Sequence, residues 1–394
     1  MAAASEEDPV VDNEAEEDLS NSDICTKYRE AGKIANLALE GVVSQVAVGA
    51  SIVSLCKFGD EVITRSVASI FRSKKVDKGV AFPTCISVNE CVCHNSPIES
   101  EGDQHPPLQE GDVVKIDLGV HVDGFIAVVG HTVTVGVAPS PEAPIGDELG
   151  NLMHAGHVCS EVATKLIRPG NTNQQVTQAW AKVAENFKVN LVQGTLSHQM
   201  KRYVIDGNKV IILKEELENK VDDFTFELNE VYAVDIAVST GDGKPRESEL
   251  RTTVFKRAVD KNYRLKMRAS RYLFNEVNSK FPTLPFTLRA FEDEKQARMG
   301  VVECQKHELV TPYPVLYERE GDKIVHFKFT LLLLPSGTVR ITGMPFEAGH
   351  FTTENAPEEE IQQIMALSSK TKKNKKKKKK KAAGEAAGEA ASEE

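Results

Sequence analysis

Asp117 is the only acid among residues 113–122, a stretch in which apolar side chains alternate. The pair Asp123-Gly124 follows, which favours a two-residue turn between antiparallel strands, and the alternation resumes over residues 125–135. Burying a carboxylate without a partner costs free energy. The sequence therefore predicts a β-hairpin in which Asp117 faces a partner from elsewhere in the chain.

Cys91, Cys93 and His94 have a spacing that could form part of a metal knuckle. No second pair of ligands follows at the spacing of zinc sites, so we expect these cysteines to lie in a strand or in the core. The seven cysteines of the chain form no regular framework. Reduced thiols in a cytosolic or nuclear protein are the expectation.

The elements that position these residues are predicted from apolar periodicity. Helical spacing extends over residues 24–56 with a break at Gly49, and Asp60 is placed to cap a second helix that continues to residue 71. Strands are expected to dominate residues 80–137.

A second helix pair is predicted beyond the proline-rich connection 138–148. Ala155-Gly156-His157-Val158 in this pair is similar to Ala31-Gly32-Lys33-Ile34 in the first, a weak echo that predicts two related α+β halves. The expected elements are helices at 152–166 and 176–183, strands at 231–239, 252–255 and 327–335, and a basic helix at 262–280.

Charge is segregated along this chain of 394 residues with a formal net charge of -10. Residues 1–23 are acidic and contain no Lys or Arg, whereas residues 370–381 are almost entirely lysine. Both ends have too few apolar residues to offset the entropy cost of ordering, so an acidic leader (1–23) and a tail (351–394) are expected to be disordered around a folded body (24–350). No run of 18 apolar residues is present, so no membrane span is expected. Residues 1–23 contain no apolar signal core, so secretion is not expected.

Five motifs, in order, resemble the methionine aminopeptidase, or pita-bread, family. They are FPTCISVNECVCHNSP (82–97), GDVVKIDLGVHVDGF (111–125), LSHQMKRYVIDGNK (196–209), NEVYAVDIAVSTG (229–241) and HFKFTLLLLP (326–335). The resemblance implies an α+β pita-bread (creatinase/aminopeptidase) fold with pseudo-two-fold related halves. Residues 261–320 are similar to the extra subdomain of the type II branch.

Active members of that family hold two divalent metal ions with two Asp, one His and two Glu. Carboxylate oxygens suit hard divalent ions, and the two ions activate a water and polarise the scissile carbonyl. The resemblance places these ligands at Asp117, Val128, His198, Asp235 and Lys328. Asp117 and His198 are retained and Asp235 is a shorter acid, whereas valine and lysine replace the other two ligands.

Lys328 in place of Glu reverses a charge that is worth about 4 kcal/mol at about 4 Å and an effective dielectric of about 20. Several kcal/mol corresponds to several decades of affinity. The sequence therefore predicts no paired metals, no cofactor and no aminopeptidase activity, and an ion pair between Asp117 and Lys328. A single ion held by Asp117, His198 and Asp235 is the alternative.

Two substrate-contacting histidines of the family match His94, which is retained, and Asp206, which is not. The resemblance thus implies a former substrate cleft at these positions. Without the full ligand set, His94 and His198 are interpreted as hydrogen-bonded histidines of the cleft or core.

Longer runs resemble the proliferation-associated, ErbB-receptor-binding protein family. They are VKIDLGVHVDGFIA (114–127), PFTLRAFEDEKQARMGVVEC (285–304) and KFTLLLLPSGTVRIT (328–342). This resemblance implies a noncatalytic, monomeric scaffold that associates with ribosomes and their precursors, structured RNA and regulatory proteins. It also implies roles in ribosome biogenesis, translation control and cell growth, in the cytoplasm, nucleus and nucleolus.

The lysine tail supplies a physical route to RNA, because each lysine that neutralises a phosphate releases a counterion. Residues 370–381 contain no aromatic residue, so stacking on bases is not expected. A nuclear or nucleolar import signal is the alternative. The ten lysines of the lysine tail are Lys370, Lys372, Lys373, Lys375, Lys376, Lys377, Lys378, Lys379, Lys380 and Lys381.

A second basic stretch lies between residues 256 and 271. On a continuous helix Arg264, Arg268 and Arg271 would share one face, which predicts either a contact for an RNA helix or a solvated surface.

Three classes of function follow from the sequence. An RNA- and ribosome-binding scaffold predicts salt-sensitive RNA binding. A module that holds nascent N-termini in the cleft predicts saturable peptide binding. A residual metal-dependent aminopeptidase predicts turnover that requires Asp117 and His198.

Overall fold

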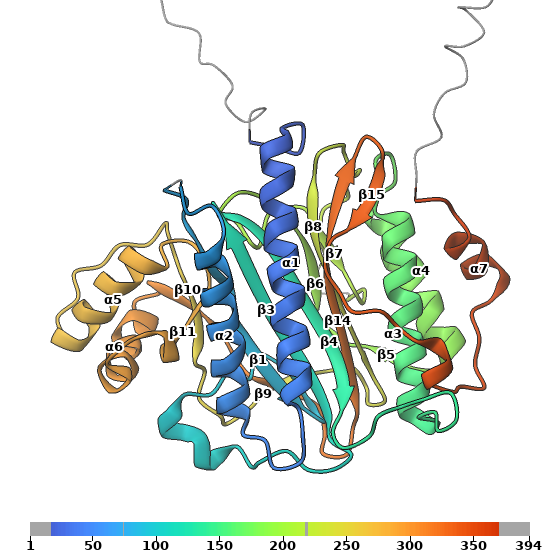
Figure 1. Ribbon diagram of the computed structural model, residues 1–394, viewed down its shortest axis with the longest axis horizontal. Helices are drawn as coiled ribbons and strands as arrows, with labels where there is room; N and C mark the ends of the chain where they lie inside the picture. Colours follow the sequence, from blue (N-terminus) through green and yellow to red (C-terminus); the bar gives the residue numbers. More distant parts are fainter. Residues whose placement is uncertain (1–16, 74, 217–219, 370–394) are drawn as a thin grey trace, which may run out of the picture.

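The computed structural model describes residues 17–73, 75–216 and 220–369 (Figure 1). Nine strands form one sheet in the order β1-β3-β4-β14-β8-β6-β7, to which β15 adds by pairing with β14 and β5 by pairing with β8. The strands are β1 (Lys78–Val88), β3 (Val113–Val122), β4 (Phe125–Thr134), β5 (Asn190–Leu191), β6 (Leu196–Met200), β7 (Val210–Ile212), β8 (Val231–Ser239), β14 (Ile324–Leu334) and β15 (Gly337–Arg340).

Two pairs of helices cover one face of this sheet. Helices α1 (Ser22–Gln45) and α2 (Ile52–Ser69) pack on β1, β3 and β4. Helices α3 (Asp147–Leu166) and α4 (Asn173–Phe187) pack on β7, β8 and β14, so each pair has its own half of the sheet (Figure 1). This arrangement agrees with the prediction of two α+β halves.

Alternation along the strands decides which side chains meet these helices. Ile116 and Leu118 of β3 join the core under α1 and α2, and Phe327 and Phe329 of β14 join the core under α3 and α4. Asp117, between the two β3 residues, therefore points to the opposite face of the sheet.

A small subdomain stands beside the main sheet, at the left in Figure 1. It combines α5 (Arg268–Lys280) and α6 (Glu294–Lys306) with a sheet in the order β11-β10-β12, formed by β10 (Val254–Arg257), β11 (Phe286–Thr287) and β12 (Val310–Tyr313). Its own apolar core includes Phe255, Leu273 and Val301. The subdomain corresponds to the insert predicted at 261–320, but it begins earlier, with β10.

The remaining elements are short. A third sheet has the order β2-β13-β9. The elements are β2 (Cys91–Cys93), β9 (Arg246–Glu247), β13 (Leu316–Tyr317), η2 (Glu99–Gln104), η3 (Leu288–Ala290), η4 (Ala348–His350) and α7 (Glu359–Met365). Cys91 and Cys93 thus lie in a strand, as predicted. Within the described segments, no helix combines the length and apolar character needed to cross a membrane.

The predicted hairpin around Asp117 is confirmed. β3 and β4 pair antiparallel from Val113 opposite Thr134 to Val122 opposite Phe125. Asp123 and Gly124 both have positive φ, 56° and 77°, as the tightest hairpin turns require.

The predicted start of the second helix was wrong. α2 begins at Ile52, where the Ser51 side chain accepts a hydrogen bond from the Ser54 N–H. Asp60 lies inside α2 instead, where it accepts the Thr84 N–H and pairs with Arg289. Asp60 therefore serves contacts with distant parts of the chain and does not cap the helix.

The folded body begins before residue 24, where the leader was predicted to end. Leu19 is buried in the core beside Tyr28, and Glu17 forms an ion pair of 2.6 Å with Arg202. Residues 1–16 of the predicted leader lie outside the described residues.

The body also continues beyond residue 350, where the tail was predicted to begin. Ile361 of α7 is 1% exposed and joins the core under α3 and α4. Ile361, Ile364 and Met365 form a short apolar stripe, which acidic neighbours obscure in the sequence. Residues 370–394 lie outside the described residues.

One row of residues crosses the middle of the sheet. Asp117 of β3 is opposite Gly130 of β4, Gly130 is opposite Lys328 of β14, and Lys328 is opposite Asp235 of β8. Directly opposed residues share a face. Because Gly130 has no side chain, the side chains of Asp117 and Lys328 can meet over it.

We predict that Gly130→Ala lowers the free energy of unfolding by about 1–3 kcal/mol. The added Cβ would lie 2.9 Å from the Lys328 Cβ and 3.2 Å from the Ile116 carbonyl oxygen. Denaturant unfolding measures the effect. The control is Gly349→Ala, whose Cβ would meet nothing within 4 Å. Equal effects of the two substitutions would contradict the prediction.

Candidate functional site

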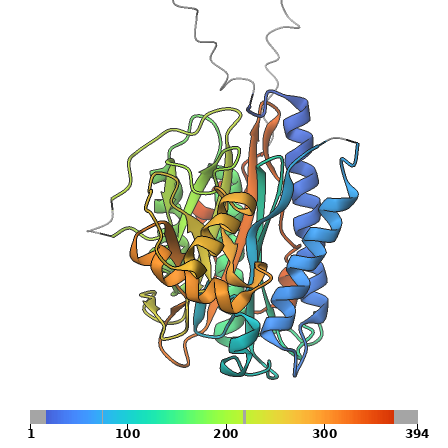
Figure 2. The same cartoon turned by 90° about the vertical axis from the view of Figure 1, so that its left-hand side faces the viewer.

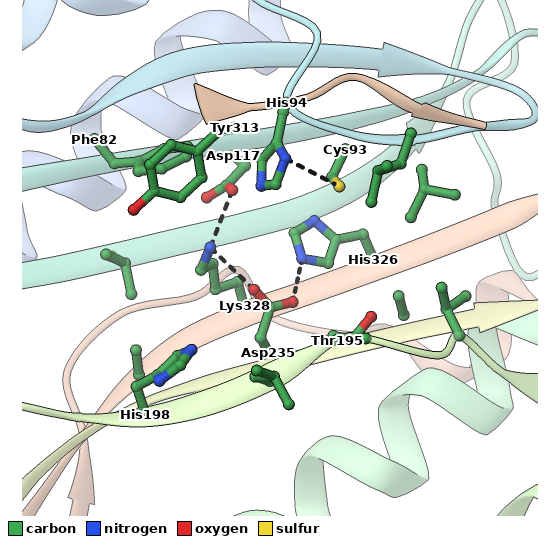
Figure 3. A pocket seen from close by; sticks show the side chains of 18 of the residues that line it. Phe82, Cys93, His94, Asp117, Thr195, His198, Asp235, Tyr313, His326 and Lys328 are labelled. Atoms are coloured by element: carbon green, nitrogen blue, oxygen red, sulfur yellow. Dashed lines mark hydrogen bonds and ion pairs between the residues drawn. The ribbon is translucent and has the colours of Figure 1, made fainter. Parts of the chain in front are cut away.

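A cavity of about 240 Å³ lies on the face of the sheet that the helices leave uncovered (Figure 3). Strands of both halves and the insert contribute to its lining. Every cleft position inferred from the sequence lines it, namely His94, Asp117, Val128, His198, Asp206, Asp235 and Lys328. Residues up to 234 positions apart in the chain are thus brought together as predicted.

Lys328 lies between two carboxylates at the centre of this cavity (Figure 3). Its Nζ is 3.1 Å from Asp117 Oδ2 and 3.0 Å from Asp235 Oδ2. The three side chains are only 14%, 7% and 17% exposed, respectively. The predicted ion pair between Asp117 and Lys328 is confirmed, and Asp235 adds a second partner that the sequence analysis did not assign.

His326 completes this cluster. It lies two residues before Lys328 on β14, and its Nε2 is 2.6 Å from Asp235 Oδ1. Both oxygens of Asp235 are therefore engaged. His326 was not among the predicted site residues, although the spacing of two residues in a strand places it on the same face as Lys328.

Burial and charge act against each other in this cluster. Burial disfavours the ammonium of Lys328, but Asp117 and Asp235 outweigh burial and raise its pKa above the ordinary lysine value. Burial also disfavours the carboxylate of Asp235, but Lys328 and His326 outweigh it and lower its pKa. Both shifts favour the ionised pair near neutral pH.

Aromatic rings form one wall of the cavity. Tyr313 contacts Phe82 and His94 edge-on, with ring centroids 5.6 Å and 5.3 Å apart. The Lys328 Nζ lies 5.2 Å from the Phe82 ring centroid, a cation–π contact. Burial lowers the pKa of His94, whose Nδ1 is 3.0 Å from the Pro314 carbonyl oxygen. His94 is therefore a hydrogen-bonded, neutral cleft histidine at pH 7.

Two polar atoms of the cavity remain without partners in the described part of the chain. They are Oδ1 of Asp117 and Nδ1 of His198, and both are buried. Burial also lowers the pKa of His198 and keeps its ring neutral. Because buried polar atoms are normally hydrogen-bonded, these two could be satisfied by a polar group that enters the cleft.

Asp206 has a different role from the histidine that it replaces in the aminopeptidase pattern. It forms an ion pair with Lys256 of β10. The pair joins the insert subdomain to the cleft lining.

The residues do not fit the pair of divalent ions that the resemblance implies for active relatives. The Lys328 ammonium lies where a metal would need the two carboxylates, and the Val128 side chain offers no donor. The Lys328 ammonium between Asp117 and Asp235 also disfavours the single-ion alternative. Among the described residues, no group of three or more His, Cys, Asp or Glu that could hold a metal ion is found.

The insert arginines do not form the predicted helical face. α5 begins only at Arg268, so Arg264 precedes the helix. The Arg271 guanidinium donates to the carbonyls of Leu265 and Lys266. The lysines of residues 370–381 lie outside the described residues.

The chain is similar to proteins of a known family. The profile of Metallopeptidase family M24 matches residues 26–254. ErbB-3 binding protein 1 of Solanum tuberosum is 48% identical over 92% of this chain and 93% of its own length. Proliferation-associated protein A of Dictyostelium discoideum is 42% identical over 93% of this chain and 94% of its own length. The curved DNA-binding protein of Schizosaccharomyces pombe is 36% identical over 91% of this chain and 93% of its own length.

A solved structure of a thermophilic Arx1 superposes with a TM-score of 0.84 at 28% identity, covering 89% of this chain and all of that one. The matches confirm the predicted pita-bread fold.

Lys328→Ala should lower the free energy of unfolding by about 3–5 kcal/mol, because it leaves two buried carboxylates without their cation. Denaturant unfolding at neutral pH measures the loss. Arg65→Ala is the control. Arg65 forms an ion pair with Glu61, and the two side chains are 81% and 59% exposed, respectively. Exposed pairs of this kind contribute about 1 kcal/mol or less to the free energy of unfolding. A Lys328→Ala effect no larger than the control would show that the cluster is not structural.

The pH dependence identifies the source of that loss. The lowered pKa of Asp235 stabilises the fold above the unfolded value of about 3.9, and this contribution is lost as the pH falls. The raised pKa of Lys328 stabilises it below about 10.4, and that contribution is lost at higher pH. The difference between wild type and Lys328→Ala should therefore be largest between these values and shrink in acid.

Proposed function

Because the chain belongs to metallopeptidase family M24 and, within it, to the ErbB-3 binding and proliferation-associated proteins, we propose that it is a noncatalytic scaffold with an aminopeptidase fold. The scaffold binds RNA, ribosomes or pre-ribosomes, and regulatory proteins. It acts as a monomer in ribosome biogenesis, translation control and the regulation of cell growth, in the cytoplasm, nucleus and nucleolus.

The proposal that the protein is noncatalytic rests on the position of the Lys328 ammonium between Asp117 and Asp235. A buried cation with a raised pKa repels divalent ions at the position where metal-dependent hydrolysis would need them. The proposed function is therefore binding of other molecules and not hydrolysis.

The RNA-binding part is supported by charge. Ten lysines within residues 370–381 follow directly on the folded body, whose last described residue is Ser369. One relative, 36% identical, carries the name curved DNA-binding protein, and another is named for binding ErbB-3. These names support a nucleic-acid contact and a protein contact, and an import role for the tail is compatible with both.

A peptide-binding cleft is the second candidate function. The unpartnered Asp117 Oδ1 and His198 Nδ1 are polar atoms that a peptide N-terminus could satisfy, beside the rings of Phe82 and Tyr313. This candidate predicts saturable binding of short peptides without cleavage.

The RNA proposal predicts steep salt dependence. If six to eight tail lysines engage phosphates, they should contribute about -4 to -6 to the log–log slope of affinity against salt. Binding of the full chain to ribosomal RNA and to purified ribosomes should be measured across a salt series. A chain that ends at Ser369, and a full-length chain with the ten lysines changed to glutamine, should both lose this part of the slope.

Undiminished binding by both altered chains would move the RNA contact to the body. Absence of binding by every chain would overturn the RNA proposal and leave the tail as an import signal.

The noncatalytic proposal predicts no hydrolysis of peptides with N-terminal methionine when Mn²⁺ or Co²⁺ is added. Product release above a protein-free control would be followed by mass spectrometry. Metal-dependent turnover that disappears in both Asp117→Ala and His198→Ala would establish a residual aminopeptidase instead.

A further inference from the structure

Helix α6 carries an exposed stripe that the aminopeptidase-like cleft does not use. Lys295, Met299, Val302 and Lys306 are separated by four, three and four residues, which places them on one helical face. Met299 and Val302 are 48% and 58% exposed, whereas the buried side of α6 includes Ala297, Gly300, Val301 and Cys304.

Met267 extends the apolar centre of this stripe. It stands just before α5 and is 46% exposed. The Glu303 carboxylate accepts the N–H groups of Lys266 and Met267 at 2.9 Å and 3.0 Å. These bonds hold the backbone at Met267 against α6, at the residue that directly follows Val302. We call Met267, Met299 and Val302 the α6 patch.

Cations surround the α6 patch. Lys295 and Lys306 lie at the two ends of the stripe, and Lys266 and Arg268 flank Met267 in the chain. All four are exposed, and none forms an ion pair with another residue of the described segments. Of the three arginines that the sequence predicted as one helical face, Arg268 is thus among the cations around this apolar surface.

The α6 patch lies on the insert subdomain. The insert subdomain lies at the left in Figure 1 and toward the viewer in Figure 2. Single exposed apolar residues are common on protein surfaces, but exposed apolar residues gathered on two linked elements among cations are typical of an interaction site. Methionine side chains adapt to apolar partners of irregular shape.

We propose that the α6 patch docks an acidic, amphipathic segment of a partner protein. Apolar side chains of the segment pack on Met267, Met299 and Val302, and its carboxylates pair with the four rim cations. A protein partner is favoured over RNA because an apolar centre offers nothing to phosphates. The inference concerns the protein-binding part of the proposed scaffold and does not depend on the lysine tail.

The test uses a synthetic amphipathic helix with leucines three and four residues apart and glutamates on both flanks. Its affinity for the full chain is measured by fluorescence anisotropy, against a peptide of the same composition in scrambled order. The ordered peptide should bind at least about tenfold more tightly. In methyl NMR spectra it should shift the signals of Met267 and Met299, while the buried Met200 stays unchanged.

Substitutions test the location. Met299→Glu with Val302→Glu should weaken the ordered peptide about tenfold or more, because it puts carboxylates into the apolar centre. The matched control is Leu37→Glu on α1, at a residue that is 53% exposed, and it should leave binding unchanged. The chain that ends at Ser369 should bind the peptide as the full chain does, which separates this inference from the RNA proposal.

Three outcomes would overturn the inference. The ordered and scrambled peptides could bind equally. The double substitution could reduce RNA binding by the body and leave peptide binding unchanged, which would make the surface an RNA contact. The chain could self-associate in sedimentation experiments and lose this association with the double substitution, which would make the surface an interface between copies.

Discussion

The ammonium of Lys328 determines what this fold can do. It lies between carboxylates from two halves of one sheet, Asp117 on β3 and Asp235 on β8, and Gly130 leaves the space in which they meet. Burying a cation costs free energy, and ionised carboxylates beside it compensate that cost. The pKa shifts of Lys328 and Asp235 favour this ionised state. The same contact joins the halves and takes the carboxylates that divalent ions would require.

The cleft around this cluster keeps features of a binding site. Neutral His94 and the rings of Phe82 and Tyr313 line it, and polar atoms of Asp117 and His198 remain available in it. Loss of the metal ligands therefore leaves a shaped, partly polar cavity. The insert is joined to this cavity through the ion pair of Lys256 with Asp206, so the protein presents the cleft and the α6 patch on connected parts.

The sequence of the lysine tail and the α6 patch differ in chemistry, which suits proposed partners of different classes. The lysine tail offers charge without apolar or aromatic groups, a composition suited to phosphates. The α6 patch combines exposed Met299 and Val302 with flanking lysines, a composition suited to an acidic protein segment. A scaffold with both could hold an RNA-containing assembly and a protein at once.

The sequence by itself determined the hairpin around Asp117 and the two helix pairs, because local periodicity encodes them. Its resemblance to the aminopeptidases, carried by ordered motifs, indicated seven of the residues that line the cleft and Lys328 as the partner of Asp117. The tertiary structure alone decided that Asp235 and His326 join the cluster, that Asp60 pairs with Arg289, and that Ile361 anchors the chain beyond residue 350. These contacts depend on strand register and on packing between distant segments, and neither is contained in the spacing of neighbouring residues.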